Sequence, residues 1–346
     1  MNRSVTGVES SGRRHVREER SAVAWAESPL QLLCIIEARY AGLVGAGTRV
    51  VCRPGLAALR RTRAELKRLD LPDGLELVTG EDGMPRPRRD AAWVFGDAFS
   101  GRVQLTWLTG DPGRVVLVDD GLATIHLLEL LAADRVTPLL RARARAGLGR
   151  RALGLAAAFR LRAAARSGRL AVFTALPVPA ALAEAVTARG AILRTHDFGW
   201  LRSQPAAHPP PDERTVVLGT SLVRNGLVRR DRYLDWLGRL SAEEPVAYYP
   251  HRREEPADLD RIGRMPGVAL RETGAPVEMT LRDLAPGQRV VSLPSTAVTS
   301  LRVLLRPRGV PVDAVEVPGD WWTPLATPDL RSHLQMFAHH DSGVTG

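Results

Sequence analysis

Residues 114–124 have the sequence RVVLVDDGLAT, in which an apolar, β-branched run ends in two adjacent carboxylates and a glycine. The run predicts a buried parallel strand, and the pattern of residues 124–132 predicts a following helix. Open α/β sheets bind ligands beyond the carboxyl ends of their strands, so one aspartate can face a crevice while the other holds the turn. Taken alone, these residues slightly favour a structural role, in which Asp119 and Asp120 cap the helix and make a turn with Gly121.

Strand-like and helical segments alternate along the rest of the chain, which is typical of a doubly wound parallel sheet. Residues 203–213, SQPAAHPPPDE, form the clearest linker, because proline disfavours both helix and central strand. We therefore expect the α/β fold class, with parallel sheets facing a central cleft. The predicted parts are a disordered tail over 1–21, Rossmann-like domains over 22–202 and 214–327, and a last helix and tail over 328–346 that can pack across the interface.

The composition is that of a globular protein with a basic surface. Hydrophobic residues make up 45% of the 346-residue chain and charged residues 25%, and the net charge is +10. The positive charge suggests an anionic partner, although part of it reflects a bias towards arginine. Cys34 and Cys52 lack metal-ligand or redox spacing. No uninterrupted apolar run reaches the ~20 residues of a membrane-spanning helix, and residues 1–21 do not resemble a signal peptide, so we expect a cytoplasmic location.

Residues 138–166 are expected to be helical and contain eight arginines together with apolar side chains. Such a segment can attract anionic lipid headgroups or an acidic acceptor, which would make the protein membrane-associated. The alternative is a solvated helix pair whose arginines follow the composition of the chain. The residues alone do not favour either interpretation.

Strand ends in the second unit carry polar residues that suit an anion: Gly219, Thr220 and Ser221 after residues 215–218, His251 and Arg252 after 246–249, and Ser295 and Thr296 after 290–293. A hydroxyl pair at a helix N-terminus can bind phosphate through free N–H groups and the helix dipole. Each of these features alone is more often an ordinary N-cap or a satisfied surface histidine. Glu278 opens another helix and could accept the hydroxyls of a ribose, although glutamate is common in a first helical turn.

In the first unit, Ser28 is well placed as the N-cap of a helix that begins at Pro29, and Asp97 lies in a second polar turn after an apolar strand. The chain lacks a Walker motif, a nucleophile elbow and a clustered Cys/His site. Asp119-Asp120 also lacks the one-residue gap of the metal-binding Asp-x-Asp pattern. We therefore expect no metal and no cofactor. Nucleic acid is not an expected partner, because the basic residues are not interleaved with aromatic ones.

As an ordered set, these residues resemble the bacterial polysialyltransferase and lipooligosaccharide-sialyltransferase group, glycosyltransferase family 52. That family has an Asp/Glu-Asp/Glu-Gly motif, a His-Pro motif and a Ser-Ser/Thr motif along two Rossmann-like domains of the GT-B type. The corresponding places are occupied by Asp119-Asp120-Gly121, His251 and Ser295-Thr296. In one departure, the proline precedes His251 and Arg252 follows it. The resemblance covers about residues 22–340 and includes the segments Ser28 to Gln31, Gly96-Asp97 and Leu218 to Leu222.

The resemblance implies an inverting, metal-independent transfer of sialic acid, or a related nonulosonate, from a CMP-activated donor to a glycan or glycolipid acceptor. Asp120 is then the base that removes the proton of the acceptor hydroxyl, and Asp119 orients it or holds the turn. Protonated His251 and the hydroxyls of Ser295 and Thr296 stabilise the departing CMP. The other implied roles are donor binding by Glu278, Gly219, Thr220, Ser221 and Arg252, and acceptor-side places for Ser28, Gln31 and Asp97.

Two further functions stay open. A GT-B transferase that uses a different nucleotide sugar fits the same motifs, since Arg252 replaces the expected proline. A non-catalytic glycan- or membrane-binding protein with the same fold fits them as well.

Overall fold

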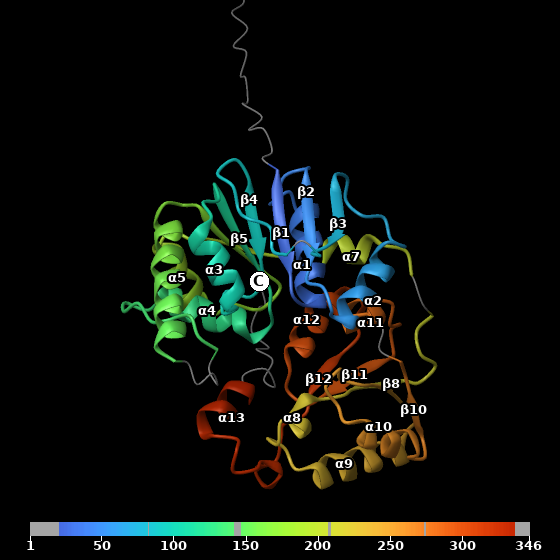
Figure 1. Cartoon of the computed structure of the whole chain (residues 1–346). Helices are drawn as coiled ribbons and strands as arrows, with labels where there is room; N and C mark the ends of the chain where they lie inside the picture. Colours follow the sequence, from blue (N-terminus) through green and yellow to red (C-terminus); the bar gives the residue numbers. More distant parts are fainter. Residues whose placement is uncertain (1–20, 82, 142–146, 207–208, 273–274, 336–346) are drawn as a thin grey trace, which may run out of the picture.

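A computed structural model of the chain describes residues 21–81, 83–141, 147–206, 209–272 and 275–335. The chain forms two parallel sheets with helices packed around them, drawn one above the other in Figure 1. The first sheet has seven strands in the order β3-β2-β1-β4-β5-β6-β7, and the second has five in the order β10-β9-β8-β11-β12. The expected α/β class, with two units that are each built on a parallel sheet, is confirmed.

The first unit contains the first strand of the chain and the strand that precedes Asp119-Asp120-Gly121, which we call the acid turn. Its strands are β1 (Ala22–Ala26), β2 (Thr48–Cys52), β3 (Leu75–Thr79), β4 (Ala92–Phe95), β5 (Arg114–Val118), β6 (Leu170–Thr174) and β7 (Ile192–Thr195). Its helices are α1 (Pro29–Tyr40), α2 (Ala57–Leu66), α3 (Gly101–Thr109), α4 (Leu122–Ala132), α5 (Leu148–Arg166), α6 (Ala180–Ala188) and α7 (Gly199–Ser203).

The second unit repeats the pattern with a smaller sheet. Its strands are β8 (Thr215–Leu218), β9 (Val246–Tyr249), β10 (Val268–Leu270), β11 (Arg289–Ser292) and β12 (Val312–Ala314). Its helices are α8 (Ser221–Arg224), α9 (Arg230–Glu243), α10 (Pro256–Gly263), α11 (Val277–Leu281), α12 (Thr296–Leu305) and α13 (Pro328–Gln335), with the 3₁₀ turns Arg306–Arg308 and Gly319–Trp321.

Each sheet has one point at which its strand order reverses. In the first sheet it lies between β1 and β4, and in the second between β8 and β11. Helices leave in opposite directions on the two sides of such a point, which leaves room for a ligand beyond the carboxyl ends of the strands. The turns predicted to carry function follow β1, β4 and β5 in the first sheet and β8, β9 and β11 in the second.

Helix α1 is buried on all sides between the first sheet and the second unit. Ser28 caps it, because the Ser28 hydroxyl accepts a hydrogen bond from the Gln31 N–H, and Pro29 supplies the first helical residue. Every residue from Gln31 to Ala38 is buried. One apolar cluster joins Leu32, Ile36 and the strands of the first sheet to Met279 and Leu301 of α11 and α12 (Figure 1). The two units therefore share part of their core.

The basic segment is less helical than expected. Residues 136–141 form no helix, residues 142–146 lie outside the described part of the chain, and α5 begins only at Leu148. Leu139 N–H donates a hydrogen bond of 3.1 Å to the Gly154 carbonyl, so this part of the chain lies against α5 instead of continuing it. No helix within the described ranges is long and apolar enough to cross a membrane.

The last helix packs on the second unit. Leu334 belongs to an apolar cluster with Trp321 and Trp322, and the Arg331 guanidinium lies 5.8 Å from the centroid of a Trp322 ring. Packing of this segment across to the first unit stays a prediction, as does the disorder of the tail, because residues 1–20 and 336–346 lie outside the described part.

Candidate active site at the junction of the two sheets

Asp120 lies in the turn after β5, and Gln31 in the first turn of α1 fixes its side chain. Asp120 Oδ1 accepts a hydrogen bond of 2.7 Å from Gln31 Nε2. The Gln31 Oε1 accepts from the Glu27 N–H at 2.8 Å, and the Ser28 hydroxyl accepts from the Gln31 N–H. A Cβ at Gly96 would overlap the Gln31 side chain, so a glycine is needed where β4 ends beside it. The ends of β1 and β4 thus orient a carboxylate on β5.

The Asp120 carboxyl titrates near neutral pH. Burial raises its pKa to about 7, and the carboxylate of Asp97 acts in the same direction, against the Gln31 hydrogen bond and the Arg141 guanidinium. Asp97 is itself buried, accepts the Phe99 N–H at 2.9 Å and forms an ion pair with Arg141. A carboxyl with such a pKa is suited to taking up a proton at physiological pH.

Asp119 lies behind this site, against β6 and β7. Its Oδ2 accepts the Ala175 N–H at 2.6 Å, and its Oδ1 has no hydrogen-bond partner among the described residues. His196 stacks on Phe173, and its Nε2 lies 3.8 Å from Asp119 Oδ2. Burial raises the pKa of Asp119 to about 6 and lowers that of His196 to about 4. The two adjacent aspartates therefore have different surroundings, and those of Asp119 suit a structural role.

Three potential metal ligands meet beside Asp119. The Cys34 thiol, an Asp119 oxygen and a His196 nitrogen lie within 4.8 Å of one another. Burial and the carboxylates of Asp119, Glu37 and Glu278 hold the pKa of Cys34 well above its usual range. The thiol therefore keeps its proton, whereas Zn²⁺ binds cysteine as the thiolate. These residues do not fit a zinc site, and the expectation that no metal takes part stays a prediction.

In the second unit, the Glu254 carboxylate ties the turns after β8 and β9 together. Its Oε2 accepts the His251 N–H at 2.8 Å, and its Oε1 accepts the Thr220 N–H at 3.3 Å and the Tyr248 hydroxyl at 2.6 Å. A Cβ at Gly219 would overlap Glu254 and the His251 backbone. The glycine predicted as a donor contact therefore lets the two turns approach each other.

His251 is neutral near neutral pH in this structure, which corrects the expected protonated form. Burial lowers its pKa to about 4, and the adjacent Arg252 and Arg253 guanidinium groups lower it as well. The Nδ1 atom accepts the Arg253 N–H at 3.1 Å, so the ring proton belongs on Nε2. His251 thus offers a neutral N–H donor, and the positive charge of this turn comes from the arginines.

The acid turn and the start of α12 meet at the junction. Gly121 has φ 69°, and a Cβ added there would lie 3.1 Å from Thr296 Cγ2 and 3.2 Å from Thr296 Oγ1. Ser295 is the N-cap residue of this ten-residue helix, but its side chain makes no capping hydrogen bond. Two partly exposed hydroxyls and a helix N-terminus therefore lie next to the acid turn.

The guanidinium of Arg252 interacts electrostatically with the carboxyl of Asp120. Burial and Arg253 lower the pKa of its guanidinium, whereas the charge of Asp120 raises it. The charge of Asp120 therefore acts on Arg252, although the two residues belong to different units. The structure thus brings together a carboxyl from the first unit with an arginine and two hydroxyls from the second.

Two of the predicted donor ligands are already engaged. Thr220 is buried, and its hydroxyl accepts the Leu222 N–H at 3.1 Å, so it caps α8. Glu278 is 4% exposed, and its Oε1 accepts a hydrogen bond of 2.5 Å from the Ser300 hydroxyl. Both side chains are buried and hydrogen-bonded within the second unit, so both residues support the local structure here. Ser221 is partly exposed at the start of α8.

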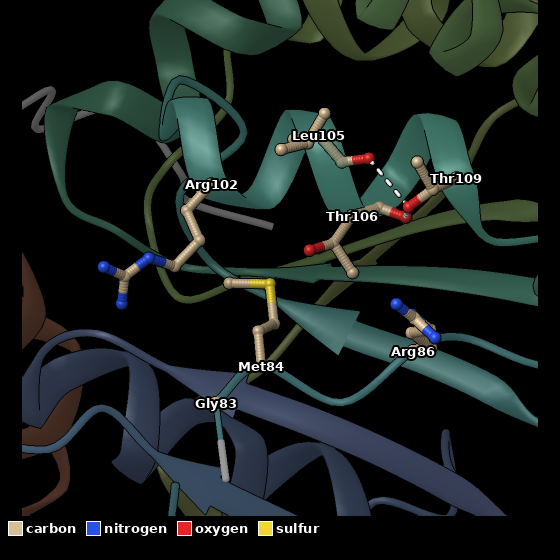
Figure 2. A pocket seen from close by; sticks show the side chains of 7 residues that line it. All are labelled: Gly83, Met84, Arg86, Arg102, Leu105, Thr106 and Thr109. Atoms are coloured by element: carbon tan, nitrogen blue, oxygen red, sulfur yellow. Dashed lines mark hydrogen bonds between the residues drawn. The ribbon is translucent and has the colours of Figure 1, made fainter. Parts of the chain in front are cut away.

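A separate cavity of about 680 Å³ lies between α3 and the loop that joins β3 to β4 (Figure 2). None of the residues predicted for the site lines it. The lining residues are Gly83, Met84, Arg86, Arg102, Leu105, Thr106 and Thr109.

Of the comparisons with known proteins, only the one with solved structures gives matches. No protein-family model and no curated protein matches the chain. A UDP-glucose:anthocyanidin 3-O-glucosyltransferase in complex with UDP is 12% identical, with a TM-score of 0.43, over 94% of this chain and 91% of that one. UGT2 of Phytolacca americana, complexed with UDP-2-fluoroglucose and pterostilbene, is 12% identical, with a TM-score of 0.44, over 92% and 83%. The glycosyltransferase of kitacinnamycin is 13% identical, with a TM-score of 0.39, over 92% and 93%.

Sequence reasoning missed several residues that support the site. Glu254 comes three residues after His251, and His196 directly follows β7, so the rule applied to the other strand ends could have found both. Arg141 gave no such signal, because it is one of many arginines in a basic segment. Its pairing with Asp97 depends on a fold that brings residues 44 positions apart into contact.

Proposed function

We propose that the protein is an inverting glycosyltransferase that moves sialic acid, or a related nonulosonate, from a CMP-activated donor to the hydroxyl of a glycan acceptor. The observation that carries this proposal is the contact between Gly121 and Thr296. It puts a carboxyl with a pKa of about 7 beside a helix N-terminus with spare hydroxyls. A base and an anion site at one junction are what a transfer from a nucleotide to an alcohol requires.

In this proposal Asp120 removes the proton of the acceptor hydroxyl. The alkoxide oxygen forms its bond to the anomeric carbon of the donor while the bond from that carbon to the CMP oxygen breaks on the opposite face. Gln31 holds Asp120 Oδ1, so Oδ2 is the oxygen that takes the proton. Ser28 and Asp97 act on the acceptor side through Gln31 and through the pKa of Asp120.

The negative charge that develops on the CMP phosphate is stabilised from the second unit. Arg252 supplies the positive charge, the neutral His251 Nε2–H donates a hydrogen bond, and Ser295 with Thr296 donates from the start of α12. A single phosphate carries little charge compared with a diphosphate, so these groups suffice without a metal ion. Thr220 and Glu278 support the turns that hold these donors, and Ser221 is available to the donor carboxylate.

Calorimetric titration with CMP, UDP and GDP tests the donor. We expect CMP to bind and Arg252→Ala to weaken that binding, whereas tight binding of UDP with no binding of CMP would replace the proposed donor with another nucleotide sugar. Transfer and donor hydrolysis test the reaction. If both continue unchanged in Asp120→Asn and His251→Ala, this junction is not the active site.

A further inference from the structure

Helices α3 and α5 carry half of the large hydrophobic side chains that are exposed within the described residues. Six large hydrophobic side chains are exposed within the described residues, and Leu105, Leu148 and Phe159, which are 58%, 88% and 53% exposed, lie on these two helices. The other three lie on three separate segments. Isolated exposed hydrophobic residues are ordinary, but a group of them on neighbouring helices marks an interaction surface.

Helices α3 and α5 run side by side. A Cβ at Gly101 would lie 3.4 Å from Arg150 Nε, and Arg160 donates to the Leu108 carbonyl at 2.8 Å. The first turns of the two helices therefore lie against each other, and so do their later turns at Leu108 and Arg160. In Figure 1, α5 lies at the edge of the first unit with α3 beside it. Their exposed side chains form one surface, which we call the α3–α5 face.

Helix α5 is apolar on two opposite sides. Its inner side buries Ala157, Ala158, Leu161, Ala164 and Ala165. Its exposed residues include Leu148, Ala152, Ala156, Phe159 and Ala163, whose spacing of three or four residues puts them on one stripe. A surface helix of a globular protein normally turns a polar side outwards. The outer stripe therefore lacks the side chains that solvation would favour.

The charge on this helix has one sign. Its 19 residues include five arginines and no acidic residue. Three of these arginines are used internally: Arg150 donates to Gln104, and Arg160 and Arg162 donate to backbone carbonyls. Arg151 and Arg166 make no hydrogen bond or ion pair within the described ranges, and both are exposed beside the apolar stripe. An apolar stripe flanked by free arginines suits an interface between hydrocarbon and anionic headgroups.

The cavity of Figure 2 adds an anion site to the same face. Leu105 belongs both to the α3–α5 face and to the cavity wall, and Arg86 and Arg102 lie at its two ends with Thr106 and Thr109 along the side (Figure 2). In the same loop, Arg88 and Arg89 pair with aspartates. Arg86 and Arg102 have no such partner in the described part of the chain. Guanidinium groups beside hydroxyls and an apolar wall suit a phosphate that is attached to a hydrocarbon chain.

We propose that the α3–α5 face docks on an anionic phospholipid bilayer, with the apolar stripe of α5 in the headgroup region and Arg86 and Arg102 on lipid phosphates. The interaction does not depend on the proposed transfer reaction. A nucleic acid would have no use for the apolar stripe. The absence of acidic side chains on α5 favours a surface of uniform negative charge over a protein of mixed charge.

Co-sedimentation of the full-length protein with vesicles tests this proposal. We expect binding to vesicles of phosphatidylcholine mixed with phosphatidylglycerol, weaker binding to phosphatidylcholine alone, and a decrease in binding as salt is added. Leu148→Asp with Phe159→Asp should lower the binding constant at least about tenfold, and Arg86→Gln and Arg102→Gln about fivefold each. The matched controls, Leu270→Asp and Arg264→Gln on the second unit, should bind as the unaltered protein does.

Three results would overturn the proposal. They are equal binding to neutral and anionic vesicles, binding that survives all four substitutions on the α3–α5 face, and an apolar face that proves to join two copies of the chain in size-exclusion chromatography. Because the altered side chains are exposed, the variants are expected to fold, and circular dichroism checks this.

Discussion

The two strand edges that meet at the junction are built in opposite ways. On the first sheet, two carboxylates are buried: Gln31 donates a hydrogen bond to Asp120, and Arg141 pairs with Asp97. The pKa of Asp120 is raised to about 7. On the second sheet, arginines crowd a histidine and lower its pKa to about 4, beside hydroxyls that the helix does not use. Burial disfavours charge on both sides, yet it produces a proton acceptor on one and leaves fixed cations on the other. The contrast teaches that the proposed acceptor and donor roles can be tested separately.

The largest expected effect comes from neutralising the acidic side. Asp120→Asn keeps the oxygen that Gln31 bonds to but cannot take up a proton, so kcat for transfer should fall by about 10²–10⁴-fold. In the unaltered protein, the rate should rise as the pH is raised through about 7, because the base acts in its ionised form. A rate that is independent of pH between 5 and 9 (roughly two units on each side of the pKa) would contradict this role.

The same substitution should stabilise the fold at alkaline pH. The pKa of Asp120 is raised from 3.8 to about 7 in the folded chain, so its contribution is present below pH 3.8 and is lost as the pH rises through 7. Asparagine does not ionise, and Asp120→Asn should therefore be about 1–2 kcal/mol more stable than the unaltered protein at pH 8, and no more stable at pH 4. Urea unfolding at both pH values measures this. Asp134→Asn, at an exposed ion pair with Arg189, is the control and should change little.

A smaller effect should follow from removing the cation on the basic side. Arg252→Ala should raise KM for the donor about tenfold and leave KM for the acceptor unchanged, since a charge-assisted bond to one phosphate is lost. Steady-state kinetics with each substrate varied in turn separate the two constants. Arg264→Gln, on an exposed arginine of the same unit, is the matched control. An equal change in both KM values would mean that Arg252 does not act on the donor alone.

Removing the hydrogen bond between Gln31 and Asp120 should have a modest effect on the transfer rate. Gln31→Leu removes the hydrogen bond that lowers the pKa of Asp120, so the pH at which the rate is half maximal should move up by about 0.5–1 unit. The maximal rate at high pH should fall less than in Asp120→Asn. A pH profile that does not move, with a lowered rate at every pH, would assign Gln31 a packing role only.

The smallest effect concerns the contact between the two sides. Gly121→Ala and Gly168→Ala both put a side chain at a positive φ, 69° and 64°, which costs about 1 kcal/mol of stability or more. Gly121 also has ψ −140°, outside the left-handed helical region, so its variant should be the less stable of the two. Only the new Cβ at Gly121 meets a neighbour, Thr296, whereas the one at Gly168 meets nothing within 4 Å. Gly121→Ala should therefore also lower the transfer rate, and Gly168→Ala should not. Equal behaviour of the two variants would mean that the contact does not matter for catalysis.

Much of the fold could be predicted from strand ends and turns. The run before Asp119, the Ser28-Pro29 start of α1 and the proline-rich linker all have local causes, since β-branched residues, caps and prolines act on their own neighbourhood. The separation of Asp119 from Asp120 followed from the alternation of side chains along a strand. These features needed no knowledge of the rest of the molecule.

The state of the site residues could not be predicted in the same way. The neutral His251 depends chiefly on its burial in the fold, and the engaged Glu278 depends on Ser300 lying opposite it. The helix expected from residue 138 starts ten residues later because Leu139 pairs with Gly154. In each case the outcome is set by which distant segment arrives beside the residue, and a pattern along the chain does not contain that information.

The burial of α1 on all sides has a consequence for how the two halves can move. Expressed alone, either half would present Leu32 or Leu301 and their neighbours to water, so neither half is a self-sufficient folding unit. A wide hinge opening would expose the same side chains and would be costly for that reason. The acid turn and the start of α12 are thus set against each other when the chain folds, and the substrates that we propose have to fit a junction whose spacing is already fixed.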